Sequence, residues 1–203
     1  MSRYRSHIAL TVWPLAVLFV SELIRLWPAL RGASSFAEAS PASWLSLLVW
    51  TVLVLVSLGA YARGWSVLVS ESGGSAGPYR TDGCRRLQKL AGGLAWALVV
   101  SQLVLHWVMT VRVGPVAVSQ YELLREFLSR PAVMVFYVLG LGALGLFLSQ
   151  GIAASFRAWG FGRGHESSRW LEIASTLTSA VMMLIAINVL SHFVTGRAYW
   201  MGP

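Results

Sequence analysis

The chain has 203 residues, of which 56% are hydrophobic and only 12% are charged, and its mean hydropathy is +0.64. A composition this apolar excludes an ordinary soluble domain and indicates a membrane protein. The net charge of +8 comes from basic residues spread over many loops and not from one basic stripe, so no nucleic-acid partner is expected.

Five apolar stretches are long enough to cross a bilayer, which takes about 20 residues of helix. In chain order they cover residues 8–27, 44–69, 87–111, 131–155 and 171–195. The sequence therefore predicts an all-α membrane protein with a single transmembrane domain over residues 1–203, in contact with membrane lipid.

Two connections have a distinct character. Residues 28–43 are rich in Ala, Ser and Pro without any periodicity, so a loop is predicted there. A short surface helix is predicted over about 119–129, because apolar residues recur on one face at helical spacing and charged residues occupy the other. The apolar set is Tyr121, Leu124, Phe127 and Leu128, and the charged set is Glu122, Arg125 and Glu126.

Basic residues are unequally divided between the two ends of the predicted helices. If the N-terminus is inside, ten Lys and Arg residues fall on the inner side and six on the outer side. Cytoplasmic segments carry the excess of Lys and Arg in membrane proteins. We therefore predict a multi-pass protein of the prokaryotic cytoplasmic membrane with its N-terminus inside and its C-terminus outside.

Ionisable and polar side chains are costly in lipid, so those inside the predicted helices are candidate functional groups, above all Glu22, Gln102, Asn188 and His192. Glu22 and Gln102 lie at similar depth, so they could hydrogen-bond to each other, or take part in proton uptake or quinone binding. His106 and His192 both lie near the outer ends of their helices. They could ligate a metal or haem, or they could be hydrogen-bonded polar residues.

Other features of the sequence exclude several kinds of functional site. Cys84 is the only cysteine, so neither a disulfide framework nor a thiolate metal site is expected. We expect no catalytic residue, because no nucleotide-binding glycine loop, catalytic triad spacing or zinc motif occurs. Small residues on the fourth helix predict close helix packing, at Gly140, Gly142, Gly145 and Gly151.

Residues 129–160 carry a recognisable pattern, Ser129-x-Pro131-Ala132, Phe136-Tyr137, Gly140, Ser149-x-Gly151, Phe156 and Trp159-Gly160. This pattern resembles the fourth membrane helix of the di-haem cytochrome b anchor subunit of succinate:quinone and fumarate:quinone oxidoreductases. The elements Arg5-x-His7 with Pro14, and Leu87-Gln88-Lys89, resemble the same family. The resemblance implies a bundle of helices one to four with helix five packed beside it.

The resemblance also places four residues at the positions of the haem-ligating histidines, namely Glu22, Ala60, Gln102 and Phe147. Glu22 would share one haem with Gln102, and Ala60 would share the other with Phe147. None of the four is a histidine, so the resemblance implies a member that works without haem. A single haem with atypical ligands, including His106 or His192, is the alternative.

The function implied by the resemblance is that of a membrane anchor in a complex II-type enzyme. The partners would be an iron–sulfur subunit, docked on the basic inner segments 80–89 and 157–169, and a flavoprotein subunit. FAD and the iron–sulfur clusters would belong to those partners, and a quinone would bind near Arg5, His7 and Arg86. The alternative is a structural or accessory anchor of a larger respiratory assembly with no electron-transfer role.

Overall fold

The computed structural model describes residues 2–39, 44–70, 82–113, 117–162, 164–197 and 199. Within these residues every regular element is a helix. The long helices are α1 (Ser2–Leu26), α3 (Trp44–Ser70), α4 (Asp82–Val108), α6 (Pro131–Ala158) and α7 (His165–Thr195). Each of the five is long and apolar enough to span a membrane. The predicted fold class is confirmed: the chain is an all-α, multi-pass membrane protein.

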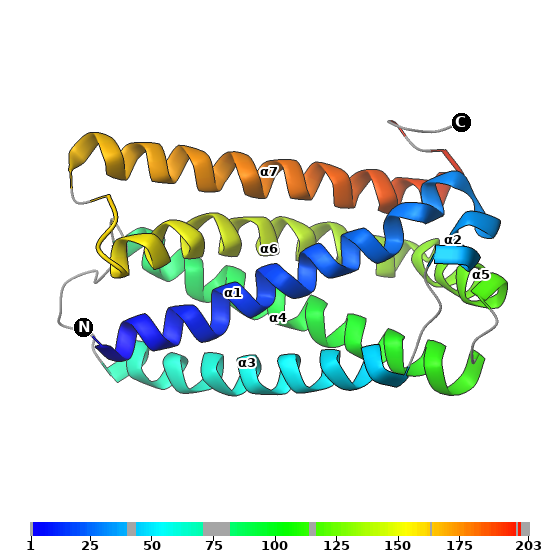
Figure 1. Ribbon diagram of the computed structural model, residues 1–203, viewed down its shortest axis with the longest axis horizontal. Helices are drawn as coiled ribbons and strands as arrows, with labels where there is room; N and C mark the ends of the chain where they lie inside the picture. The colour runs from blue at the N-terminus through cyan, green and yellow to red at the C-terminus, as the bar shows by residue number, and fades with distance from the viewer. Residues whose placement is uncertain are drawn as a thin grey trace.

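The five long helices form the predicted arrangement, a bundle of four with the fifth beside it. Helices α3, α1, α6 and α4 pack in that order around a common core, and α4 closes the ring against α3. Helix α7 lies outside the ring against α6, as Figure 1 shows. Most helices extend beyond their predicted bounds, because hydropathy reveals only the apolar part of a helix; α7, for example, begins at His165 and not at residue 171.

Three short elements lie together at one end of the bundle, the right-hand end of Figure 1, called here the capped end. They are η1 (Trp27–Arg31), α2 (Ala33–Ala39) and α5 (Ala117–Leu128), and α2 packs against both others. The loop predicted over residues 28–43 is therefore wrong where the structure describes it. Helix α2 has only seven residues, too few to show periodicity, and the contact of fully buried Phe36 with Tyr121 of α5, 6.0 Å between ring centres, holds it in place.

The predicted short helix is confirmed in α5, together with its two faces. Tyr121, Leu124 and Leu128 are buried, whereas the charged residues of the opposite face are exposed. The next element, α6, begins with Pro131 at its first position, where the missing N–H costs no hydrogen bond.

Helix α6 contacts three other long helices closely through its glycines. A Cβ atom on Gly140 would lie 3.1 Å from Leu98 of α4, and one on Gly151 would lie 2.6 Å from Val12 of α1. A Cβ on Gly145 would overlap Met183 of α7. The fourth predicted small position, Gly142, has no neighbour at this distance. Glycines thus set the distances between α6 and its neighbours, which is the usual way that helices approach closely in lipid.

Candidate functional site

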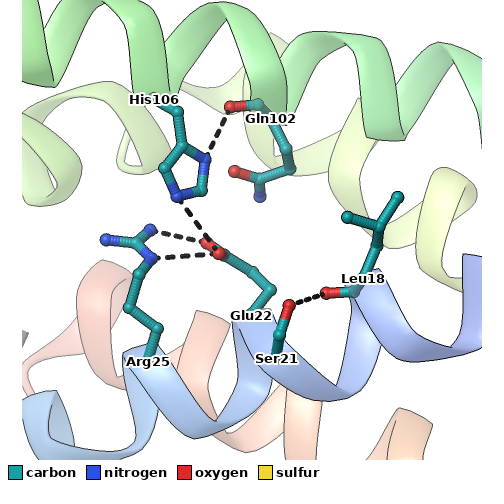
Figure 2. Close-up of polar contacts among 6 residues, drawn as sticks. All are labelled: Leu18, Ser21, Glu22, Arg25, Gln102 and His106. Carbon is teal, nitrogen blue, oxygen red and sulfur yellow. Dashed lines mark hydrogen bonds and ion pairs between the residues drawn. The ribbon is translucent and has the colours of Figure 1, made fainter. Parts of the chain in front are cut away.

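Glu22 lies buried in the core, 6% exposed, on the last two turns of α1. Arg25, one turn later on the same helix, donates two hydrogen bonds to its carboxylate, Nη2 to Oε1 at 2.6 Å and Nε to Oε2 at 3.0 Å. Figure 2 shows the two side chains in this two-pronged contact. A guanidinium that binds both carboxylate oxygens matches their geometry and neutralises the buried charge. The spacing of three residues that permits this contact is visible in the sequence.

His106 of α4 approaches the same carboxylate from across the core. Its Nδ1 lies 3.1 Å from the carbonyl oxygen of Gln102, to which it donates a hydrogen bond, and its Nε2 lies 3.6 Å from Oε2 of Glu22. The imidazole is 2% exposed and packs on the indole of Trp50, 4.7 Å between ring centres. Sequence reasoning placed His106 near a helix end but missed its contacts with Glu22 and Trp50, because they depend on the rotation of three helices.

The predicted hydrogen bond between Glu22 and Gln102 is absent from the described structure. Glu22 binds Arg25 instead, and the Gln102 Oε1 atom is buried without a hydrogen-bond partner among the described residues. The two side chains are nevertheless close in space, since both line the same pocket. The predicted proximity is therefore correct, while the predicted bond is not.

That pocket, called here the α1–α7 pocket, has a volume of about 70 Å³. Its walls are apolar side chains of α1, α4, α6 and α7, with Trp50 of α3 and Leu128 of α5. Besides the indole of Trp50, three lining side chains carry polar groups: Glu22, Gln102 and Tyr137. Glu22 and Gln102, the first pair of positions that resemble haem-ligand sites, therefore both lie on the wall of one small, largely apolar pocket.

The second pair of positions that resemble haem-ligand sites, Ala60 and Phe147, has a different environment. Phe147 of α6 is 2% exposed and meets the ring of Tyr61 edge-on, 6.2 Å between ring centres. Tyr61 follows Ala60 on α3 and also packs against Trp96 of α4 at 6.0 Å. A Cβ on Gly92 would lie 2.6 Å from the Tyr61 hydroxyl oxygen and 3.0 Å from the Phe147 ring. Side chains thus fill the core between α3, α4 and α6.

Neither pair fits an iron-bound haem. Ala60 and Phe147 carry no ligand atom, and the ring of Phe147 packs against Tyr61, which in turn packs against Trp96. Both carboxylate oxygens of Glu22 accept hydrogen bonds from Arg25, and the pocket beside Gln102 is far smaller than the roughly 300 Å³ at which pockets for small molecules begin.

His192 of α7 has partners of its own at the capped end. Its Nε2 lies 3.0 Å from the Tyr121 hydroxyl of α5, and its ring packs against Tyr121 and Phe193. His106 and His192 therefore take part in separate contacts. The described residues contain no group of three or more His, Cys, Asp or Glu side chains that could hold a metal ion.

The predicted quinone site lies at the opposite end of the bundle, where the N-terminus is drawn in Figure 1. The side chains of Arg5 and His7 lie outside the described residues, although both positions belong to α1; Arg86 is exposed at the start of α4. Close by, Trp13 of α1 stacks on Trp159 at 6.0 Å and donates a hydrogen bond from Nε1 to Ser155 Oγ at 2.7 Å. This contact joins α1 to the end of α6 and was not foreseen from the sequence.

The basic side chains in the two segments predicted to dock a partner differ in their exposure. Arg157 is not free to bind a partner subunit. Its Nη1 donates a hydrogen bond to Oε1 of Glu172 of α7 at 2.9 Å, and its side chain is only 15% exposed. Arg169 and Arg86 are exposed. Residues 80 and 81 and the side chain of Arg85 lie outside the described residues. The exposed basic side chains are accompanied by exposed aromatic ones, Phe161 and Trp170.

Comparisons of the chain with models of protein families, with curated proteins and with solved structures gave no match. The function is therefore inferred from the residues and their arrangement.

Proposed function

We propose that the chain is the membrane-anchor subunit of a complex II-type succinate:quinone or fumarate:quinone oxidoreductase and that it works without haem. The observation that carries this proposal is the environment of the four positions that resemble haem-ligand sites. An arginine-paired carboxylate and an aromatic side chain occupy two of them, while the bundle of four helices with a fifth beside it persists. The fold is thus compatible with the family, and its interior is compatible with loss of the cofactors.

The absence of haem would determine where the quinone reacts. Without a redox group inside the bundle, electrons from a partner's iron–sulfur cluster cannot cross to the far side of the membrane, so the quinone must bind near the partner. We place this site at the end opposite the capped end, near Arg5, His7 and Arg86. Arg and His side chains donate hydrogen bonds to a quinone carbonyl, and His can also supply a proton.

The same end would face the cytoplasm and hold the partner subunits. The excess of basic residues supports an inside N-terminus in a prokaryotic cytoplasmic membrane. The exposed side chains of Arg86, Arg169, Phe161 and Trp170 would form the docking surface for the iron–sulfur subunit. The flavoprotein subunit, with its FAD, would bind that subunit in turn.

One observation favours a second candidate, a structural anchor with no electron-transfer role. Arg157 and Glu172 satisfy each other, which removes one predicted docking cation from the surface. A purely structural anchor needs helix packing of this kind and no quinone site.

Purification of the tagged chain from its native membrane tests both candidates. We expect the iron–sulfur and flavoprotein subunits to co-purify, with quinone reductase activity and without a stoichiometric b-type haem band in the reduced-minus-oxidised spectrum. A stoichiometric haem band, or purification without those partners, would contradict the proposal.

Two variants separate the candidates. His7→Gln and Arg86→Gln should reduce quinone reductase turnover in the intact complex, whereas Arg125→Gln on the exposed face of α5 should not, since it lies at the other end. Unchanged turnover in the first two variants would favour the structural anchor.

A further inference from the structure

Three helices meet at Gly151, near the end of α6 that lies away from the capped end of the bundle (Figure 1). A Cβ atom at this position would lie 2.6 Å from Val12 of α1 and 3.1 Å from the side-chain amide nitrogen of Gln88 of α4. Glycine therefore lets both helices come close to α6, and a larger residue would push α1 away. Val12 and Gln88 are both buried, so this contact belongs to the core. It is called here the Gly151 junction.

Gln88 attaches the start of α4 to α6. Its Nε2 atom donates a hydrogen bond of 3.0 Å to the main-chain carbonyl of Phe147, one turn before the junction, and the residue is 5% exposed. A carbonyl only accepts, so the amide nitrogen must be the donor. The same turn of α4 is also held by Tyr61 of α3, whose hydroxyl donates to the carbonyl of Lys89 at 3.0 Å. Two hydrogen bonds between helices therefore fix the turn of α4 that follows Arg86.

Trp13, next to Val12, attaches α1 to the same part of α6. Its Nε1 atom donates to the Ser155 hydroxyl at 2.7 Å, and its ring stacks on Trp159 with the two planes 6° apart. Ser155 is 1% exposed and lies one turn after the junction. The hydrogen bonds of Gln88 and Trp13 thus reach α6 on either side of the junction. Helix α6 is the common support of α1 and α4 at this end of the bundle.

We propose that Gln88 and Trp13 are positioning residues for the proposed quinone site. The inference rests on the proposed function, which supplies the ligand and the site. Arg5 and His7 precede Trp13 on α1. Arg86 precedes Gln88 on α4, so the two sides of the site belong to two different helices. Each side is attached to α6 by one of the two hydrogen bonds, and the Gly151 junction sets the separation of the helices. No contact with the quinone is assigned to Gln88 or Trp13.

The separation of the two sides matters because a quinone is a rigid ring with a carbonyl oxygen at each of two opposite positions. Donors on two helices bind such a ring only if the helices keep a constant distance, and a displacement of about 1 Å weakens binding or catalysis strongly. The competing interpretation is that the two hydrogen bonds only stabilise the bundle. The bond between Ser149 of α6 and Thr176 of α7, 3.0 Å between the hydroxyl oxygens, is a contact of that kind, because α7 carries no residue of the site.

Steady-state kinetics of the purified complex with a short-chain quinone test the proposal. Gln88→Met keeps most of the side-chain length and removes the donor, and Trp13→Phe keeps an aromatic ring and removes the indole N–H. Each variant should raise the quinone KM about fivefold, the equivalent of one hydrogen bond, and change kcat by less than about twofold. Ser149→Ala, the matched control, removes the hydrogen bond with Thr176 and should leave the quinone KM unchanged.

An unchanged quinone KM in both variants, or an equal rise in Ser149→Ala, would overturn the proposal. Electron transfer from succinate to a soluble dye, which bypasses the quinone site, is measured in the same preparations and reports whether the partner subunits are retained and active. Gln88→Met and Trp13→Phe alter different helices, so the test stands if one of them does not fold. If the unaltered chain lacks quinone reductase activity, the proposed function fails first. If the activity is present and both variants behave like the control, only the positioning role is refuted.

Discussion

The two pairs of positions that resemble haem-ligand sites have different interiors. Around Ala60 and Phe147, aromatic rings from three helices meet and fill the core. Around Glu22 and Gln102, an ion pair and a histidine lie beside a pocket. The first region is therefore stabilised by packing, and the second by charge compensation.

The two regions show that the interior of a helix bundle can be stabilised in two different ways. In the first region, the rings of Tyr61, Trp96 and Phe147 pack against one another and fill the core closely. In the second region, the buried carboxylate of Glu22 requires a cation nearby, and Arg25 supplies it. The α1–α7 pocket lies beside the second region. Four changes would test this comparison, and they follow in decreasing order of their effect on stability.

Arg25→Met should have the largest effect. It leaves the Glu22 carboxylate buried without its cation, which costs about 3–5 kcal/mol in unfolding free energy. Unfolding in mixed micelles with increasing denaturing detergent measures this loss. The double variant Glu22→Leu with Arg25→Met should recover most of the stability, because it removes both charges together. If the single variant is as stable as the unaltered protein, the ion pair does not stabilise this region.

Phe147→Ala should destabilise the other region by a smaller amount, about 2 kcal/mol. A buried Phe→Ala change costs more in soluble proteins, but part of that cost is transfer from water, which is missing when the separated helices remain in lipid. The same unfolding experiment applies. Phe147→Leu, which keeps most of the volume, should lose less than half as much. Equal losses in the two variants would show that the ring contacts with Tyr61 are unimportant.

Gly92→Ala tests the tight packing of the aromatic region directly, with its neighbour Gly93 as the matched control. The new methyl group would meet the Tyr61 hydroxyl oxygen at 2.6 Å, and such overpacking costs about 1–3 kcal/mol. Gly93 has no atom within this range, so Gly93→Ala should be neutral or stabilise by up to about 1 kcal/mol through helix propensity. The two thermal unfolding midpoints should therefore move in opposite directions. Parallel shifts would show that the core around Tyr61 adapts freely.

Gln102→Leu should have the smallest effect on stability, within about 0.5 kcal/mol. Its Oε1 atom has no hydrogen bond to lose among the described residues, and leucine has a similar size. His106 keeps its bond to the main-chain carbonyl of residue 102, which this change does not alter. A loss above about 2 kcal/mol, measured by the same detergent titration, would mean that the amide has an essential structural partner.

The five long helices were predictable from the sequence, and so were α5 and its exposed and buried faces. Stretches of apolar residues located all five long helices, and the alternation of charge located α5, because both signals are local. Helix α2 was missed because a helix of seven residues depends on the contact of Phe36 with a helix more than 80 residues away. The shared depth of Glu22 and Gln102 was also predictable, since depth follows from counting along each helix.

Which side chains meet across the core depends on the tertiary structure. The sequence alone established a five-helix membrane protein, with no histidine at the positions that resemble ligand sites. It did not reveal that His106 turns toward Glu22, or that Tyr61 and Trp96 close around Phe147. Such contacts depend on the rotation and separation of neighbouring helices. The rotation and separation of α6 are set where Gly140, Gly145 and Gly151 closely approach atoms of three other helices. The sequence of one helix alone does not reveal these approaches.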